Sequence, residues 1–135
     1  MKKEELSASD INQIKRLIGQ LDSTAVFKPR AFYKAQQNGY VNLIRIDKKI
    51  IGLGWIFPRQ TLLRKQAVVE DMIVDLDYRG RGLGEKILLN LIAWARKKGI
   101  EVVELTTNPK RVAANNLYKK IGFKLHKTNH YLLNL

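Results

Sequence analysis

The segment 74–84 constrains the fold more than any other part of the sequence, because it places three glycines and two arginines between a strand-like run and a helix-like run. Alternating glycines let the backbone approach a ligand closely, with amide hydrogens pointing outward. A helix that begins here adds the positive end of its dipole, which favours an anion. Arg79 and Arg81 add two cations. The segment therefore predicts a phosphate or pyrophosphate site, unless its glycines serve only the geometry of a tight turn.

Spacing excludes two common phosphate-binding motifs. The dinucleotide pattern G-x-G-x-x-G, started at Gly82, would need a glycine where the chain has Ile87. A Walker A loop needs Gly-Lys-Ser or Gly-Lys-Thr, and neither occurs in the chain. The remaining pattern is Arg79-x-x-Gly82-x-Gly84.

Apolar periodicity and turn residues predict an order of elements typical of a mixed α/β domain spanning residues 1–135. The expected helices are one capped by Ser7 or Ser9 and running to Leu21, a short one over Ala31–Gln37, one from Leu83 to the stop at Gly99, and one over Arg111–Lys120. The expected strands are Tyr40–Ile46, Ile50–Phe57 with a stop at Pro58, Ala67–Val74, Val102–Thr106, and Phe123–Leu135 with a break near Thr128.

Charge and cysteine content limit the function classes. The 135 residues include 25 Lys and Arg, 12 Asp and Glu and no cysteine, which gives a net charge of +13. The absence of cysteine excludes disulfides, thiolate metal sites and a cysteine nucleophile. The positive charge fits either nucleic-acid binding or a soluble lysine-rich surface. No apolar run approaches the roughly 18 residues of a membrane span, and no secretory signal is evident, so we expect a cytoplasmic protein.

The pattern Arg79-x-x-Gly82-x-Gly84 resembles the Q/R-x-x-G-x-G/A signature of the GNAT superfamily of acetyl-CoA-dependent N-acetyltransferases. The segment Ala113–Phe123 resembles the second motif of that family, in the correct order. The resemblance implies an α/β fold whose central, mostly antiparallel, twisted sheet has six to seven strands and about four flanking helices. It also implies that the sheet is splayed between its fourth strand, Ala67–Val74, and its fifth, Val102–Thr106.

The resemblance further implies acetyl-CoA as co-substrate and assigns residues to it. Backbone groups of the fourth strand would pair with the pantetheine arm, as an added strand does. These groups belong to Met72, Ile73 and Val74. The pyrophosphate would lie against the loop of Arg79, Gly80, Arg81, Gly82, Leu83 and Gly84. Asn115 resembles a cofactor contact, with a solvated helix amide as the alternative.

Two side chains are predicted to transfer protons. Tyr118 aligns with the tyrosine that protonates the departing thiolate in many relatives; the alternative is a core tyrosine. Glu70 is the predicted base that accepts a proton from the amine, with a water held by a carboxylate or a histidine as the alternative base. Asp71 is predicted to orient the acceptor or its loops. Regular alternation in a strand would place these two carboxylates on opposite faces of the sheet. The alternative is a structural role in ion pairs.

The predicted activity is direct transfer of an acetyl group to a primary amine, since no cysteine exists to carry it. Relatives with a histone-type site have the base glutamate where this chain has Val68, and the Glu-Asp placement resembles amino-sugar-phosphate acetyltransferases. A small amine is therefore the first acceptor class. A protein N-terminus or lysine is the alternative, as is a non-catalytic nucleic-acid-binding or regulatory module.

Four further expectations concern ligands and partners. His126 and His130 lack clustered carboxylates and do not indicate a metal site. Assigning Arg79 and Arg81 to the cofactor phosphates weighs against nucleic acid as the partner. A homodimer remains open. Trp55 is expected in the core, with a place in the acceptor cleft as the alternative.

Overall fold

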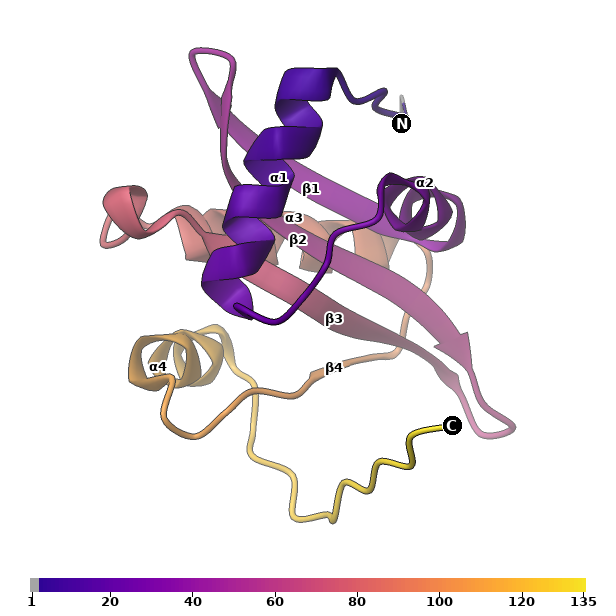
Figure 1. The fold of residues 1–135 in the computed structure, drawn as a ribbon. Coiled ribbons are helices and arrows are strands. Elements are labelled where there is room, and N and C mark those ends of the chain that lie inside the picture. Colours follow the sequence, from indigo (N-terminus) through magenta and orange to yellow (C-terminus); the bar gives the residue numbers. More distant parts are fainter. Residues whose placement is uncertain (1–2) are drawn as a thin grey trace.

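The computed structural model describes residues 3–135, and its elements follow the predicted order (Figure 1). The helices are α1 (Ala8–Leu21), α2 (Pro29–Asn38), α3 (Leu83–Lys97) and α4 (Val112–Ile121), with a short 3-10 turn, η1 (Leu76–Tyr78). The strands are β1 (Tyr40–Ile46), β2 (Lys49–Gln60), β3 (Lys65–Val74) and β4 (Val102–Leu105). Ser7 caps α1 in a capping box with Asp10.

The four strands form one sheet in the order β1-β2-β3-β4. The first three strands are antiparallel, and β4 is parallel to β3. Helices α1 and α2 cover one face of the sheet and α3 covers the other (Figure 1). Each helical layer buries its own apolar cluster. One includes Ile14, Leu17, Phe32 and Leu53; the other includes Ile56, Ile87, Leu88 and Leu91. The glycine-arginine segment connects β3 to α3 at the edge of this second cluster.

A β-bulge interrupts β3. Leu53 of β2 is opposite Ile73, but Trp55, two residues later, is opposite Glu70, so β3 carries one extra residue between these pairs. Asp71 has a left-handed φ of 55°, a conformation that Asp adopts more readily than most residues. Burial follows this change of register. Val69 before the bulge and Met72 after it both pack against the cluster under α3.

Strands β3 and β4 separate beyond Val69. Their ladder joins Gln66–Val69 to Val102–Leu105. Within residues 3–135, the second half of β3 has no neighbouring strand on that side. This is the splay that the resemblance implied, located between β3 and β4 of the observed sheet. It leaves backbone groups of Met72–Val74 outside the β3–β4 ladder.

Two strand predictions were wrong. The sheet has four strands in the described chain, not six to seven, and the segment Phe123–Leu135 forms no strand. Residues 124–135 are exposed throughout and pair with no strand of the described chain. Alternating apolar residues become a strand only when a partner strand supplies hydrogen bonds and side-chain contacts. His126 and His130 therefore lie in this irregular segment.

The predicted end of the second strand was also wrong, because β2 continues through Pro58 to Gln60. Beyond Ile56, β2 has no β1 residue beside it. A proline nitrogen, which lacks a hydrogen, is tolerated at such a strand edge.

No helix within residues 3–135 is long and apolar enough to cross a membrane.

Candidate functional site

A cleft of about 450 Å³ lies where β3 and β4 separate, between the second half of β3, the glycine-arginine segment and α4. All of the predicted acetyl-CoA contacts line it except Arg81 and Asn115. The predicted residues at this cleft are Met72, Ile73, Val74, Arg79, Gly80, Gly82, Leu83 and Gly84. The fold thus brings together the strand and loop portions of the predicted site.

The loop at one end of the cleft depends on glycine. Gly80 and Gly82 have φ values of 77° and 74°, in the left-handed region that side chains rarely adopt. Gly82 is also the residue that caps α3. A β-carbon at either position would meet no atom within 4 Å, so the loop is bounded there by open space. Backbone amides at the start of a 15-residue helix therefore border space that an anion can fill.

The two arginines of the loop have different roles. Arg79 lines the cleft, and its Nε donates a hydrogen bond to the Val74 carbonyl at 3.0 Å. Arg81 does not line the cleft; its guanidinium lies over the ring of Tyr78, 5.0 Å from the ring centre. The prediction that both cations flank the ligand therefore has direct geometric support only for Arg79.

Asp75, directly after β3, is the most strongly perturbed acid at this end of the molecule. Its side chain is fully buried, and its Oδ2 lies 2.7 Å from Nη2 of Arg16 and 3.8 Å from Nζ of Lys49. The hydrogen bond from Arg16 is the main cause that lowers the pKa of Asp75 from 3.8 to about 2. A hydrogen bond from the Asp77 amide adds to this effect.

We predict that Asp75→Asn lowers the free energy of unfolding by about 2 kcal/mol at pH 7, because about 1.4 kcal/mol accompanies each pKa unit. A carboxyl whose pKa is lowered by folding stabilises the protein above its unfolded pKa and loses that contribution as the pH falls toward 2. Urea unfolding of both proteins between pH 7 and pH 2 measures the difference. A difference that stays constant over this range would contradict the assignment.

Asn115 has a structural role in this geometry. Its Nδ2 donates to the carbonyls of Asn108, at 3.1 Å, and Arg111, at 2.8 Å. These bonds tie the segment after β4 to the first turn of α4. Asn115 does not line the cleft, and its predicted contact with the cofactor stays a prediction.

The two predicted acceptor-side carboxylates lie at the bulge. The bulge removes the regular alternation on which their expected placement on opposite faces depended. Burial raises the pKa of Glu70, and the negative charge of Asp71 raises it further, while His130 opposes this rise. Burial also raises the pKa of Asp71. A carboxylate with a raised pKa is a stronger base, as proton removal from an amine requires.

Trp55 is directly opposite Glu70 in the β2–β3 ladder, so the two side chains share one face of the sheet. The indole Nε1 donates to the Ala35 carbonyl of α2 at 3.1 Å, and the ring lies 4.7 Å from that of Phe57. This places Glu70 on the face covered by α1 and α2, whereas α4 borders the cleft described above.

Tyr118 lies in α4 and is buried against the cluster under α3, with its ring edge-on to Phe123 at 6.0 Å. Burial raises its pKa, so the phenol keeps its proton throughout the neutral range. Neither Tyr118 nor Glu70 is among the residues that line the cleft, but Leu117, one residue before Tyr118, lines it. Tyr118 thus has both the packing expected of a core tyrosine and the protonated phenol expected of a general acid.

Sequence reasoning missed several residues of the site. Tyr78, Arg111 and Ala114 line the cleft. Thr107, just after β4, has a buried Oγ1 with no hydrogen-bond partner in residues 3–135. A buried hydroxyl without a partner is costly, and its position directly after the strand that separates from β3 makes it a candidate ligand contact. The position of Thr107 just after the strand expected beside the splay is the sequence signal that could have identified it.

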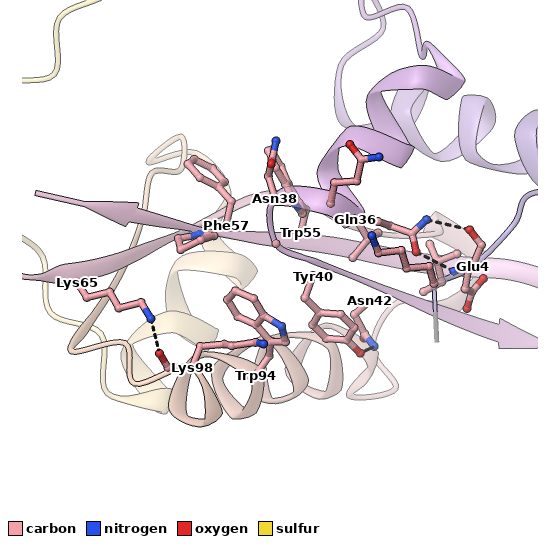
Figure 2. A pocket seen from close by; sticks show the side chains of 16 residues that line it. Glu4, Gln36, Asn38, Tyr40, Asn42, Trp55, Phe57, Lys65, Trp94 and Lys98 are labelled. Atoms are coloured by element: carbon pink, nitrogen blue, oxygen red, sulfur yellow. Dashed lines mark hydrogen bonds between the residues drawn. The ribbon is translucent and has the colours of Figure 1, made fainter. Parts of the chain in front are cut away.

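A larger cavity, of about 1070 Å³, lies at the free edge of β1 (Figure 2). Figure 2 shows Trp55 and Phe57 on one side of the strands and Tyr40 and Trp94 on the other. None of the predicted catalytic or cofactor residues lines it. We therefore place the candidate site at the smaller cleft, which combines the open strand edge with the helix N-terminus.

The described residues contain no group of three or more His, Asp or Glu side chains that could hold a metal ion.

A model of the acetyltransferase (GNAT) family matches residues 11–123. Among curated proteins, the chain is 32% identical over 92 residues to the probable N-acetyltransferase camello of Xenopus tropicalis, covering 68% of this chain and 42% of that protein. It is 37% identical over 59 residues to the glucosamine 6-phosphate N-acetyltransferase of Trypanosoma brucei brucei, covering 44% and 38%. The chain thus spans about two fifths of the length of either relative.

The fold is similar to the crystal structure of glucosamine-6-phosphate N-acetyltransferase from Arabidopsis thaliana, with a TM-score of 0.80. That match covers 96% of this chain and 95% of the other, at 23% sequence identity. At this identity the likeness concerns the fold alone.

Proposed function

Since the chain belongs to the acetyltransferase (GNAT) family, we propose that it transfers an acetyl group from acetyl-CoA to a primary amine in one direct step. The observation that carries the proposal is the cleft at the splay of β3 and β4. One end of the cleft is a glycine loop whose backbone amides can bind an anion, and the other is an unpaired strand edge. A pyrophosphate attached to an amide-containing arm matches this combination.

The residues at the cleft fit acetyl-CoA in three respects. The loop of Gly80 and Gly82 is open where side chains would otherwise stand, so its amides can reach a pyrophosphate. The second half of β3 has backbone groups that can pair with the amides of the pantetheine arm. Thr107 does not line the cleft, but its Oγ1 is buried without a partner in the described chain, and we assign it a hydrogen bond to the bound acetyl donor.

In the proposed reaction, Glu70 accepts a proton from the ammonium form of the acceptor, which leaves a nucleophilic amine. The amine nitrogen forms a bond to the thioester carbonyl carbon, and the carbon–sulfur bond breaks. Tyr118 donates its phenolic proton to the departing sulfur, giving the free thiol of CoA. The nitrogen then loses its second proton, which restores the Tyr118 phenol through solvent. Glu70 releases the proton it accepted to solvent, so each turnover yields the amide, free CoA and one proton.

We propose a small primary amine as the acceptor. The relative of Trypanosoma brucei brucei that is 37% identical over 59 residues carries the name glucosamine 6-phosphate N-acetyltransferase, which supports an amino sugar phosphate as the first compound to test. The net charge of +13 also disfavours polycationic acceptors, because like charges repel during encounter.

Release of free thiol from acetyl-CoA tests the proposal. The panel should contain glucosamine 6-phosphate, glucosamine, spermidine and a lysine-containing peptide, and acetyl-CoA binding should be followed separately as a rise in melting temperature. We expect stabilisation by acetyl-CoA and thiol release with at least one small amine. If no amine released thiol and acetyl-CoA did not raise the melting temperature, the enzyme proposal would be wrong.

A pair of glycine variants tests the loop. Gly82→Ala should raise the KM for acetyl-CoA by about tenfold, because a methyl group enters the cradle and the left-handed backbone costs about 1–2 kcal/mol. The matched control is Gly99→Ala, since Gly99 has a φ of 69° and equally open surroundings at the far end of α3. It should lose similar stability and keep the wild-type KM. Equal KM changes in both variants would remove the loop assignment.

A further inference from the structure

Two side chains of helix α1, those of Arg16 and Gln20, reach the segment that leads into the glycine-arginine loop, and of the two only Gln20 forms a hydrogen bond with its backbone. Its Oε1 accepts a hydrogen bond from the Leu76 amide at 2.9 Å. Its Nε2 donates to Oδ1 of Asp75 at 3.4 Å. Gln20 lies about 55 residues earlier in the sequence and belongs to no motif of the loop.

The segment that Gln20 contacts is fixed from several directions. The Asp75 amide donates to the Ile51 carbonyl at 2.8 Å, and the Asp75 carbonyl accepts from the Tyr78 amide at 2.9 Å. Arg16, one turn before Gln20 on α1, forms the 2.7 Å ion pair with Asp75. Helix α1 thus holds both the carboxylate of Asp75 and the next amide along the chain.

The loop beyond this segment has little packing of its own. Gly80 and Gly82 would meet no atom within 4 Å even if they carried a β-carbon, and the Leu76 side chain is 64% exposed. The side-chain anchors of the loop are the ring of Tyr78, which packs against the cluster under α3, and Arg79, whose Nε donates to the Val74 carbonyl. The Tyr78 ring lines the cleft and has Lys49 Nζ at 5.2 Å and the Arg81 guanidinium at 5.0 Å from its centre. The position of this ring depends on the turn that Gln20 holds.

We infer that Gln20 is a positioning residue for the nucleotide end of acetyl-CoA. This inference rests on the proposed function. By holding Leu76 and Asp75, Gln20 keeps the turn of η1 in place, and with it the Tyr78 ring and the amides that converge on the pyrophosphate. A loop that is already ordered before binding loses less conformational entropy when the ligand binds. The role does not extend to the thioester end, which is held by β3 and α4.

The test uses two acetyl donors that differ in the 3′-phospho-ADP group, which contains the pyrophosphate that the loop would hold. S-acetylpantetheine carries the thioester and the pantetheine arm but ends before the pyrophosphate. In Gln20→Met, which keeps the side-chain volume and removes both hydrogen bonds, the KM for acetyl-CoA should rise about tenfold with kcat unchanged. The kcat/KM for S-acetylpantetheine should stay at the wild-type value.

The matched control is Gln13→Met. Gln13 lies two turns earlier on α1, and its Oε1 accepts from the Ile50 amide, so it ties the same helix to β2 instead of to the loop. Gln13→Met should leave the preference between the two donors unchanged, whatever its effect on melting temperature. An equal loss of kcat/KM with both donors in Gln20→Met would overturn the inference. The same change in donor preference in Gln20→Met and Gln13→Met would also overturn it.

Calorimetric binding of CoA and ADP separates this inference from the proposed function. If the wild-type protein binds CoA but acetylates no amine, the catalytic proposal fails, and weaker CoA and ADP binding in Gln20→Met still supports the positioning role. Unchanged binding of both ligands in Gln20→Met would refute that role. If the wild type binds neither ligand, both the proposed function and this inference are wrong.

Discussion

Replacing Tyr118 with phenylalanine is expected to lower kcat by about 10²-fold, the lower end of the range for general acid catalysis. The phenyl ring keeps the contact with Phe123 and the packing against the cluster under α3, so the melting temperature should change little. The departing thiolate would have to take its proton from water. Single-turnover measurements with saturating acetyl-CoA report the chemical step directly.

The control for this variant is Tyr33→Phe. Tyr33 lies in α2, outside both cavities, and its hydroxyl accepts a hydrogen bond from the Leu6 amide at 3.2 Å. The Tyr33→Phe substitution removes a phenol hydroxyl that lies outside the cleft, so kcat should stay at the wild-type value. Unchanged turnover in Tyr118→Phe would leave Tyr118 as a core residue only.

Glu70→Gln is expected to lower kcat by about 10²- to 10³-fold and to change its dependence on pH. Burial and the charge of Asp71 raise the pKa of Glu70, so the wild-type rate should climb as the pH rises through that raised value. Glutamine cannot accept the proton, and this limb of the profile should disappear. A pH profile of kcat under saturating conditions measures both effects.

The stability of Glu70→Gln distinguishes catalysis from folding. A carboxyl whose pKa is raised by folding destabilises the protein above that pKa, so its removal should not lower the free energy of unfolding at pH 7. Asp71→Asn is the neighbouring control, because Asn also tolerates the left-handed backbone at this position. It should raise the KM for the amine more than it lowers kcat. If Asp71→Asn instead abolished the acid limb, Asp71 would be the base.

Local sequence patterns were sufficient for the glycine-arginine loop and most of the elements around it. The left-handed turns at Gly80 and Gly82 depend on the residue type itself, and the helix that follows is specified by its apolar stripe. The cleft lining therefore agrees with the residues expected from positions 72–84, apart from Arg81. Arg81 does not line the cleft, because its guanidinium lies over the ring of Tyr78, a residue that belongs to no phosphate-binding pattern.

The alternation of side chains along the sequence led to wrong predictions where strand formation or side-chain placement depended on a neighbouring strand. The apolar residues of 123–135 alternate as a strand requires, but the described chain offers them no paired edge. The opposite placement of Glu70 and Asp71 was also inferred from regular alternation, which the mismatch between Leu53–Ile73 and Trp55–Glu70 interrupts. A bulge is a property of two strands in register, so the sequence of β3 alone cannot predict it.

The sequence by itself thus determined which residues the proposed chemistry can use: a glycine loop at a helix N-terminus, two adjacent carboxylates, a tyrosine in the last helix and no cysteine. These features depend on residue type and short spacing. Only the tertiary structure decided that β3 and β4 separate after Val69, that Asp71 lies at a bulge, and that Gln20 of α1 holds the turn before the loop. Each of these depends on contacts between segments far apart in the chain, and such contacts are set by packing rather than by local preference.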